Sequence, residues 1–441
     1  MFVFACLYFC DILTGNTDRS IMDKTIFHVD VNSAFLSWEA TYRIHVLGEK
    51  NDLRDIPSAV GGDVKKRHGI ILAKSTSAKK YGVRTGDTIA EALKLCPNLV
   101  TVPPHYDLYD RCSHSFMDIL REFSPDVEPY SLDEAYVDMT HTIDSFGPPL
   151  AVAHTIKDRI RDELGFTVNV GVSSNKLLAK MAGDFKKPDL VHTLYPDEVV
   201  SKMWPLPVGD LLFVGHSTRR KLYNLGIFTI GDLAKSDLNI IHNHFGKVGD
   251  VLYSFANGID LAPVLDSAPA NKGYGNSSVI PFDVNRTDAA KIVLLSLAET
   301  VAARLRTDHV MIRVVSVNIV YTDFSHESHQ VTLMTPTNIT NEIHRTACKL
   351  FDDLWSGSPV RNLGIHTSKV TPASTERQIN MFDMHQFEKL SQIDCTVDVI
   401  RTRYGQDSVK RAVFVDNPIY HMSGGISIEK RKPKYGGGIL S

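Results

Sequence analysis

The sequence lacks the features that mark several classes of protein. Its six cysteines are scattered and form no CxxC pair, which argues against a zinc site and a secreted disulfide framework. The apolar segment at residues 1–10 is far shorter than the about 20 residues of a membrane-spanning helix. The net charge is −3, so any nucleic-acid surface must come from local clustering of basic residues. The 18 histidines are dispersed, and none lies at metal-ligand spacing.

What is present fits a soluble, multidomain protein. A chain of 441 residues is too long for one ordinary core, so we expect two to four domains. The thiol pattern suits a reducing compartment, and we expect a cytoplasmic protein without a membrane anchor. A second methionine, Met22, precedes the first strand-like run. We therefore expect residues 1–21 to be a dispensable extension, with a weak signal-type segment as the alternative.

Strand-like and helix-like runs alternate along the chain. Their order indicates an α+β fold with helices against one face of an antiparallel sheet. Short helices follow a proline-rich boundary near residues 188–207, and a second α+β domain follows from residue 271. In the first domain we expect strands at 25–31, 69–73 and 167–172, helices at 35–46, 109–123, 150–164 and 176–182, and a hairpin around 133–134.

Three carboxylates suggest a metal centre. Asp30 ends an apolar strand-like run, and Asp133 and Glu134 are adjacent among strand-forming residues. Magnesium prefers oxygen ligands, and two such ions about 3.5–4 Å apart stabilise both oxygens of a phosphoryl displacement. Neighbours in a flat strand point to opposite faces, so Asp133 and Glu134 share a site only at a strand end or bulge, as in a hairpin. The alternative is three unrelated surface acids.

A basic block lies between residues 61 and 87. It contains seven Lys or Arg residues, including Lys74 and Lys79, against two Asp. Lys176 opens a predicted helix, where the positive N-terminal field favours a triphosphate. An ordinary solvated lysine is the alternative for Lys176.

Three sequence blocks resemble one known family. His28-Val-Asp30-Val-Asn-Ser-Ala-Phe35 and Ser131-Leu-Asp133-Glu134-Ala-Tyr are similar to the two carboxylate motifs of Y-family (DNA polymerase IV, or UmuC-like) translesion polymerases. Residues 171–180 and 182–188 resemble the third block of that family. The match runs in order through about residues 24–265 and more weakly to the end. Three blocks in the right order are highly specific.

The resemblance implies a right-hand polymerase. Its parts would be a palm and fingers at 22–190 (fingers at about 36–100), a helical thumb with a helix-hairpin-helix at 191–270, a little-finger DNA-binding domain at 271–370, and a tail at 371–441. The implied activity is error-prone lesion-bypass DNA synthesis with two Mg²⁺ ions, a primer–template and deoxynucleoside triphosphates. We expect a monomer associated with the nucleoid.

The resemblance also implies roles for individual residues. Phe35 would be a steric gate against the 2′-hydroxyl, with an ordinary core residue as the alternative. Where the family often has a Tyr and an Arg on the phosphates, this chain has Thr76 and Lys79, and Lys74 is a possible substitute. The two metals would be held by Asp30, Asp133 and Glu134 with the Val31 carbonyl, and Glu134 is the acid that the family treats as catalytic.

Two further segments resemble binding elements. Residues 208–232 are similar to the helix-hairpin-helix of the family, although Phe213 replaces the usual first glycine of the turn. Two packed helices are the alternative. Gln378, Ile379, Met381 and Phe382 resemble the peptide that docks bacterial polymerases on the sliding clamp, with a strand packed on its own domain as the alternative. Residues 397–441 carry eight basic and four acidic side chains and predict a flexible arm.

Two other functions remain open from the sequence. A nucleotidyl cyclase can also place two metal-binding acids on a palm-like sheet. A clamp-bound DNA-damage accessory protein without catalysis is suggested by Thr76 and Lys79, but the three intact carboxylates argue against it.

Overall fold

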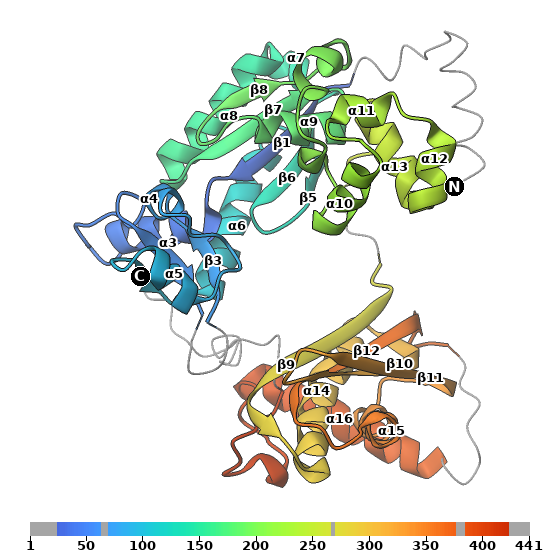
Figure 1. Cartoon of the computed structure of the whole chain (residues 1–441). Coiled ribbons are helices and arrows are strands. Elements are labelled where there is room, and N and C mark those ends of the chain that lie inside the picture. The colour runs from blue at the N-terminus through green and yellow to red at the C-terminus, as the bar shows by residue number, and fades with distance from the viewer. Residues whose placement is uncertain (1–23, 63–68, 266–269, 376–383, 423–441) are drawn as a thin grey trace. The chain divides into compact units, whose positions relative to one another are not determined.

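The computed structural model describes residues 24–62, 69–265, 270–375 and 384–422. The chain divides into two units whose main boundary falls between residues 268 and 269 (Figure 1). Each unit is described by itself below. Within the described ranges, no helix has the length and apolar character needed to cross a bilayer.

The first unit is built on a five-stranded sheet in the order β5-β6-β1-β7-β8. All pairs are antiparallel except β7 and β8. The central strand β1 contains four apolar residues besides His28 and Asp30, and it is buried along its whole length. The strands are β1 (Ile26–Val31), β5 (Val127–Pro129), β6 (Glu134–Asp138), β7 (Val168–Ser173) and β8 (Val191–Thr193).

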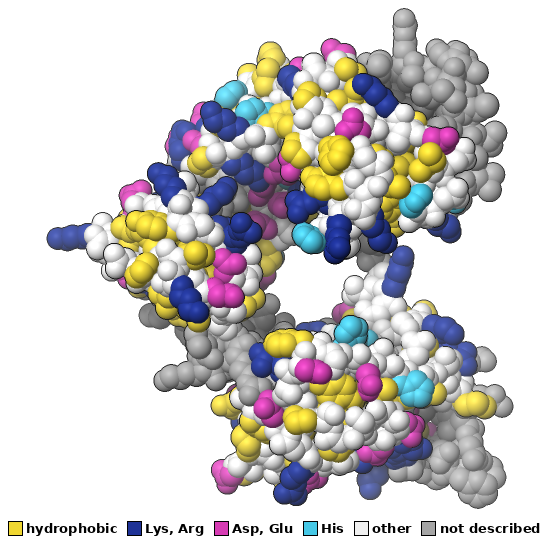
Figure 2. All heavy atoms as spheres, viewed as in Figure 1, with side chains coloured by type: hydrophobic (Ala, Val, Ile, Leu, Met, Phe, Trp, Pro, Cys, Tyr) yellow, Lys and Arg dark blue, Asp and Glu magenta, His cyan; other side chains and the backbone are white. Residues whose placement is uncertain are grey.

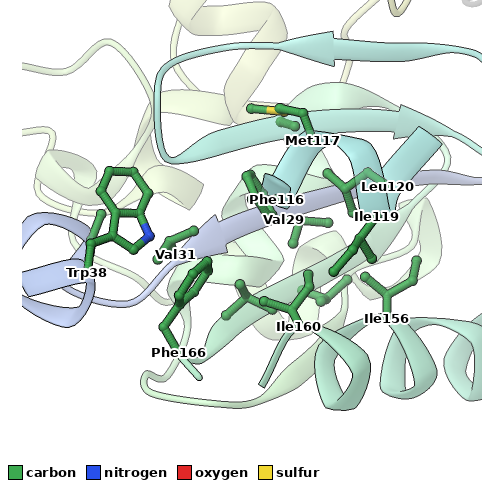
Figure 3. Packing of buried hydrophobic residues seen from close by; sticks show 14 of the residues in the cluster. Val29, Val31, Trp38, Phe116, Met117, Ile119, Leu120, Ile156, Ile160 and Phe166 are labelled. Carbon is green, nitrogen blue, oxygen red and sulfur yellow. The ribbon is translucent and has the colours of Figure 1, made fainter. Parts of the chain in front are cut away.

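The main core lies between this sheet and helices α6 (Tyr106–Arg121) and α8 (Pro149–Leu164). Figure 3 shows Val29 and Val31 of β1 among Phe116, Ile156 and other apolar side chains of these helices. Because side chains alternate along a strand, the even-numbered residues of β1 face the other side. That side is covered by α9 (Lys176–Asp184), where Ala179 packs with Ile26 and Tyr136. The expectation of helices on one face alone was therefore wrong.

A small three-stranded module follows the first helix, α3 (Ala34–His45). Its strand order is β3-β2-β4, and it buries its own apolar cluster, which includes Ile71 and Val83. The elements are β2 (Ser58–Gly61), β3 (Ile71–Lys74), α4 (Thr76–Lys80), α5 (Ile89–Leu95) and β4 (Val100–Val102).

The rest of the first unit is mainly helical. A short helix, α7 (Ile143–Phe146), precedes α8. After the sheet, short helices share a core with α9, in which Leu178 meets Leu222 and Leu252. The elements are η2 (Pro196–Glu198), η3 (Val199–Met203), η4 (Val208–Asp210), α10 (His216–Asn224), α11 (Ile230–Ala234), α12 (Leu238–Phe245) and α13 (Lys247–Ala256).

The turn before α10 contains a strained residue. Phe213 has a φ of 70°, in the left-handed region that costs an L-residue about 1–2 kcal/mol. Its ring stacks on Phe255 with centroids 5.7 Å apart and planes at 26°. An aromatic pair contributes about 0.5–1.5 kcal/mol, so the stack does no more than offset the strain. The side chain of Phe213 remains 59% exposed.

The second unit has a four-stranded antiparallel sheet in the order β11-β10-β12-β9. Val315, Val317 and Ile319 alternate inward from β10 and pack beneath α14 and α15. The opposite face is polar and lines a hollow with Ser316 and Asn318. The elements are β9 (Gly273–Val284), α14 (Thr287–Thr307), β10 (Val310–Tyr321), β11 (His326–Thr337), α15 (Thr340–Leu354) and β12 (Val360–Pro372).

The chain after residue 384 packs on this second unit through α16 (Met384–Tyr404) and η5 (Ala412–Phe414). Glu299 of α14 is buried and forms ion pairs with Arg401 at 3.3 Å and with Arg411 at 2.7 Å. Phe414 joins the hydrophobic core. The prediction of a flexible arm is therefore wrong for residues 397–422, because a buried carboxylate needs these cations.

The close contact between α9 and β7 generates a stability prediction. A Cβ on Gly171 would overlap the carbonyl oxygen of Ala179 and lie 2.5 Å from the amide nitrogen of Gly183. We expect Gly171→Ala to lower the free energy of unfolding by about 3 kcal/mol, because α9 must move away. Gly215→Ala is the matched control, since no atom lies within 4 Å of its Cβ position. Equal denaturant midpoints for the two variants would contradict this packing.

Candidate active site

Three carboxylates meet at one end of β1 and β6. Asp30 and Glu134 are directly opposite each other in the antiparallel pair, so their side chains lie on the same face of the sheet. Asp133 immediately precedes β6, and its carbonyl accepts a hydrogen bond from the Val31 amide at 2.9 Å. The hairpin thus removes the strict alternation that would have separated Asp133 from Glu134.

The carboxyl of Asp30 is buried and lies close to two other acidic residues. Burial raises the pKa of Asp30 to about 6, and the charges of Glu134 and Asp133 add to the rise. The ammonium of Lys187 forms an ion pair with Asp30 and opposes this shift. The ammonium of Lys187 therefore favours the ionised form of Asp30.

Glu134 is held by two partners on the α9 side. The ammonium of Lys180 forms an ion pair with it, and His28 Nε2 lies 3.3 Å from Glu134 Oε2. Burial alone would raise the pKa of Glu134, but hydrogen bonds from His28 and Lys180 bring it to about 2. Burial lowers the pKa of His28 and so favours the neutral form of its ring.

Each acid therefore has a partner of its own. The hydroxyl of Ser131 donates to Asp133 at 2.6 Å, while lysines neutralise Asp30 and Glu134. Over the described ranges, no three His, Cys, Asp or Glu side chains converge in a group ready to hold a metal ion. The three predicted residues are neighbours, but their side chains point to lysines and a hydroxyl.

A cleft of about 410 Å³ opens beside these acids. Figure 2 shows acidic side chains inside a recess of the first unit, with Lys and Arg side chains around it. The cleft brings together residues from β1, α3, the three-stranded module and the segment after α9. Those predicted from the sequence are Asp30, Val31, Phe35, Lys74, Thr76, Lys79 and Asp133.

One wall of the cleft is aromatic. The ring of Phe35 is stacked on Tyr109, with centroids 4.6 Å apart and planes at 8°. The hydroxyl of Tyr109 donates to Glu39 Oε1 at 2.8 Å, and Glu39 is fully buried. His105 Nδ1 also lies 2.8 Å from the same carboxylate oxygen. Phe35 is therefore held in position from behind by a chain of contacts between α3 and α6.

Two lysines also line the cleft. Lys74 donates to Thr85 at 3.2 Å, and its pKa is lowered by burial and then by the charge of Lys79. Two neighbouring ammonium groups that repel each other are suited to an anion, which would relieve that repulsion. Thr76 lies between them in sequence and also lines the cleft.

Lys176 does not line this cleft. Its ammonium is bound by both oxygens of Glu128, at 2.6 and 2.7 Å, and lies 4.7 Å from the ring centroid of Tyr136. Lys187 lies in the cleft instead. Lys187 belongs to the third family-like block at residues 182–188, and no local sequence signal marked it as a residue of the cleft.

The proposed clamp-docking residues Gln378, Ile379, Met381 and Phe382 lie outside the described residues.

Three protein-family models match successive parts of the chain. Residues 29–184 match the model of the impB/mucB/samB family, and residues 271–381 match the C-terminal domain of the same family. Residues 209–260 match the model described as the DNA polymerase-iota thumb domain.

Curated relatives cover most of the chain. A protein named DNA polymerase IV from Clostridium acetobutylicum is 43% identical over 395 residues, which are 90% of this chain and 99% of the relative. A protein of the same name from Acetivibrio thermocellus is 38% identical, over 90% of this chain and 98% of the relative. Bacillus subtilis has a 36% identical relative named DNA polymerase IV 2, matched over 88% of this chain and 94% of the relative.

A solved structure shares the fold. The Y-family DNA polymerase chimera Dbh-Dpo4-Dbh superposes with a TM-score of 0.67 at 22% sequence identity. The match covers 79% of this chain and 99% of the chimera. The expected architecture, an α+β right-hand fold with a helical thumb and a C-terminal domain, is confirmed.

Proposed function

Because the chain belongs to the impB/mucB/samB family of Y-family DNA polymerases, and is a DNA-directed DNA polymerase of the translesion class, we propose that the cleft between Asp30, Phe35 and Lys79 is its nucleotidyl-transfer site. The observation that carries this assignment is the convergence of acids, an aromatic ring and cations from separate elements on one cavity. The cyclase and inactive-accessory alternatives are not favoured, because the polymerase relatives match nearly the whole chain.

Y-family polymerases generally depend on divalent metal, and the oxygen donors here suit such an ion in chemistry, although lysines pair with Asp30 and Glu134 in this structure. We assign two Mg²⁺ ions to Asp30, Asp133 and Glu134, with the Val31 carbonyl as a further ligand. All are oxygen donors, which Mg²⁺ prefers, and a bound cation would offset the burial that raises the pKa of Asp30. When bound, the metals would stabilise the attacking primer oxygen and the leaving phosphate oxygen.

The two lysines have separate roles in this proposal. Lys180 and Lys187 act as counter-ions of Glu134 and Asp30 before substrate enters. Lys187 lines the cleft, so its ammonium can turn from Asp30 to the incoming triphosphate, together with Lys74 and Lys79. These cations position the phosphates, and the reaction needs positioning and charge stabilisation more than covalent help. Lys176 is left with a structural role through Glu128.

Phe35 is assigned to sugar selection. Its ring lines the cleft and rests on Tyr109, which Glu39 fixes by a hydrogen bond. If the ring is held in place, it leaves no room for a 2′-hydroxyl, whereas a mobile ring would move aside and admit the hydroxyl. Selection against ribonucleotides therefore depends on the support behind Phe35 as well as on the ring itself.

The remaining assignments concern DNA and partners. We propose that residues 22–190 form the palm and fingers, 191–270 the thumb, and 271–370 the domain that holds duplex DNA through its polar sheet face. The substrates are then a primer–template and deoxynucleoside triphosphates. The sliding clamp as a partner of residues 378–383 and a monomeric state remain predictions.

The central test is the variant Asp133→Ala. We expect primer extension to fall by about 10³-fold or more, because a metal ligand worth several kcal/mol in the transition state is removed. DNA affinity, measured by fluorescence anisotropy, should stay within about twofold, and the exposed-acid variant Asp144→Ala should extend normally. Undiminished incorporation by Asp133→Ala would remove the site assignment.

The aromatic gate is tested with ribonucleotides. We expect Phe35→Ala to reduce discrimination against ribonucleotides by about 10- to 200-fold in single-nucleotide kinetics. Phe35→Tyr keeps a ring on Tyr109 and should retain discrimination. Unchanged sugar selectivity in Phe35→Ala would show that another group excludes the hydroxyl.

The lysine assignment is tested by comparing two variants. We expect Lys187→Ala to raise the KM for the nucleotide by about tenfold or more, because a charge-assisted contact to phosphate is lost. Lys176→Ala is the control, and its KM should change by less than about twofold, since Glu128 holds its side chain away from the cleft. A larger rise in KM for Lys176→Ala than for Lys187→Ala would instead identify Lys176 as the triphosphate ligand.

A further inference from the structure

A fully buried asparagine lies in β7, with a valine on either side of it. Asn169 has no exposed surface, and β7 lies between β1 and β8 in the sheet (Figure 1). Asparagine is uncommon in strands, and a buried amide costs free energy unless its hydrogen bonds are made. Asp30 of β1 is directly opposite Asn169, so both side chains lie on the face of the sheet that α9 covers.

The side-chain amide of Asn169 bridges the two ends of one loop. Its Nδ2 donates to the carbonyl of Gly183 at 3.0 Å and to the carbonyl of Lys186 at 2.6 Å. Its Oδ1 accepts from the backbone amide of Leu190 at 3.3 Å. Two carbonyls and one N–H need two donors and one acceptor, which a side-chain amide supplies. An aspartate, a serine or an apolar residue here would leave at least one of these backbone groups unmatched.

The bridged loop contains the lysine that reaches the acids. Lys187 and Pro188 lie between the loop ends that Asn169 holds, and both line the cleft. A lysine ammonium is attached to a flexible four-carbon chain, so its position depends on how firmly the backbone beneath it is held. A displacement of about 1 Å in a group that positions a substrate can reduce a reaction rate about 10²-fold.

A second element also holds this loop. The ammonium of Lys157 in α8, whose side chain is only 8% exposed, lies 3.1 Å from Asp189 Oδ1. Arg161 of the same helix lies 3.7 Å from the other carboxylate oxygen of Asp189. The loop is therefore fixed from β7 by an amide and from α8 by ion pairs.

We propose that Asn169 is a positioning residue for nucleotide binding, which fixes residues 183–190 and thereby places the Lys187 ammonium against the triphosphate. This inference rests on the proposed function, which assigns that ammonium to the incoming triphosphate. Asn169 acts through the loop, because the hydrogen bonds of its side chain go to backbone groups of α9 and of the loop. The competing explanation is a core amide that stabilises the packing of α9 on β7 and has no effect on the nucleotide.

The experiment measures kcat and the KM for the incoming nucleotide in single-nucleotide primer extension. We expect Asn169→Ala to raise KM about five- to tenfold and to change kcat by less than about threefold, because the loss falls on triphosphate binding. In a Lys187→Ala background, Asn169→Ala should change KM by less than about twofold, since both residues act through one ammonium. DNA affinity, measured by anisotropy, should stay within about twofold of the wild type.

Asn175→Ala is the matched control for lost stability. The side chain of Asn175, at the start of α9, also bonds a carbonyl and an amide, those of Gly258 at 3.0 Å and Leu178 at 2.8 Å. We expect both asparagine variants to lower the melting temperature by about 2–8 °C. The KM of Asn175→Ala should nevertheless stay within about twofold of the wild type, because its partners lie outside the loop of Lys187.

Lys157→Met provides a test that does not depend on the folding of Asn169→Ala. It removes the shorter of the two ion pairs of Asp189 and leaves the amide of Asn169 in place. We expect KM to rise about two- to threefold, and this rise should also disappear in the Lys187→Ala background.

Two results would overturn the inference. If Asn169→Ala lowers the melting temperature while its KM stays at the wild-type value, the amide is a core contact alone. If its effect on KM multiplies with that of Lys187→Ala, it acts by a route other than this ammonium. In both cases the proposed function stands. If Lys187→Ala leaves KM unchanged, or the wild-type chain does not extend a primer, the proposed function fails and the inference falls with it.

Discussion

The first unit depends on how three crowded carboxylates are neutralised. Asp30 and Glu134 share one face of the sheet, and Asp133 lies beside them at the hairpin. Uncompensated charges this close would destabilise the fold or force one acid to take a proton. The chain supplies two ammonium groups, Lys180 from α9 and Lys187 from the segment after it.

The position of α9 determines where those ammonium groups lie. Gly171 lets the helix approach β7 more closely than a Cβ at that position would allow. A residue with a Cβ at Gly171 would move the helix and both lysines with it. The close contact between Gly171 and α9 therefore determines both the backbone packing and the positions of the charges that neutralise the acids.

The sequence predicted much of this arrangement. The alternating apolar residues of β1 and the amphipathic pattern of α6 and α8 are local signals, and they placed the central strand and the covering helices correctly. The hairpin at Asp133 and Glu134 followed from the rule that strand neighbours face opposite ways. Motif order then gave the family, which the comparisons confirm.

The features that the sequence did not show are long-range pairings. Lys176 and Lys187 both lie in the third family-like block, and only the fold shows that Glu128 binds the first while the second reaches Asp30. The support of Phe35 by Tyr109 and Glu39 joins two helices about 70 residues apart. The basic composition of residues 397–441 suggested an unstructured arm, because the buried carboxylate that recruits Arg401 and Arg411 lies a hundred residues earlier.

The docking of the C-terminal segment bears on how partner binding can be studied. A truncation before residue 378 is the obvious way to delete a clamp-docking peptide, but it would also delete Arg401 and Arg411. Glu299 would then be a buried charge with its ion-pair partners removed, a loss that costs about 3–5 kcal/mol in comparable proteins. If a shortened chain fails to function, the cause would thus be damage to its second unit rather than the loss of clamp binding. Point substitutions within residues 378–383 keep the two effects apart.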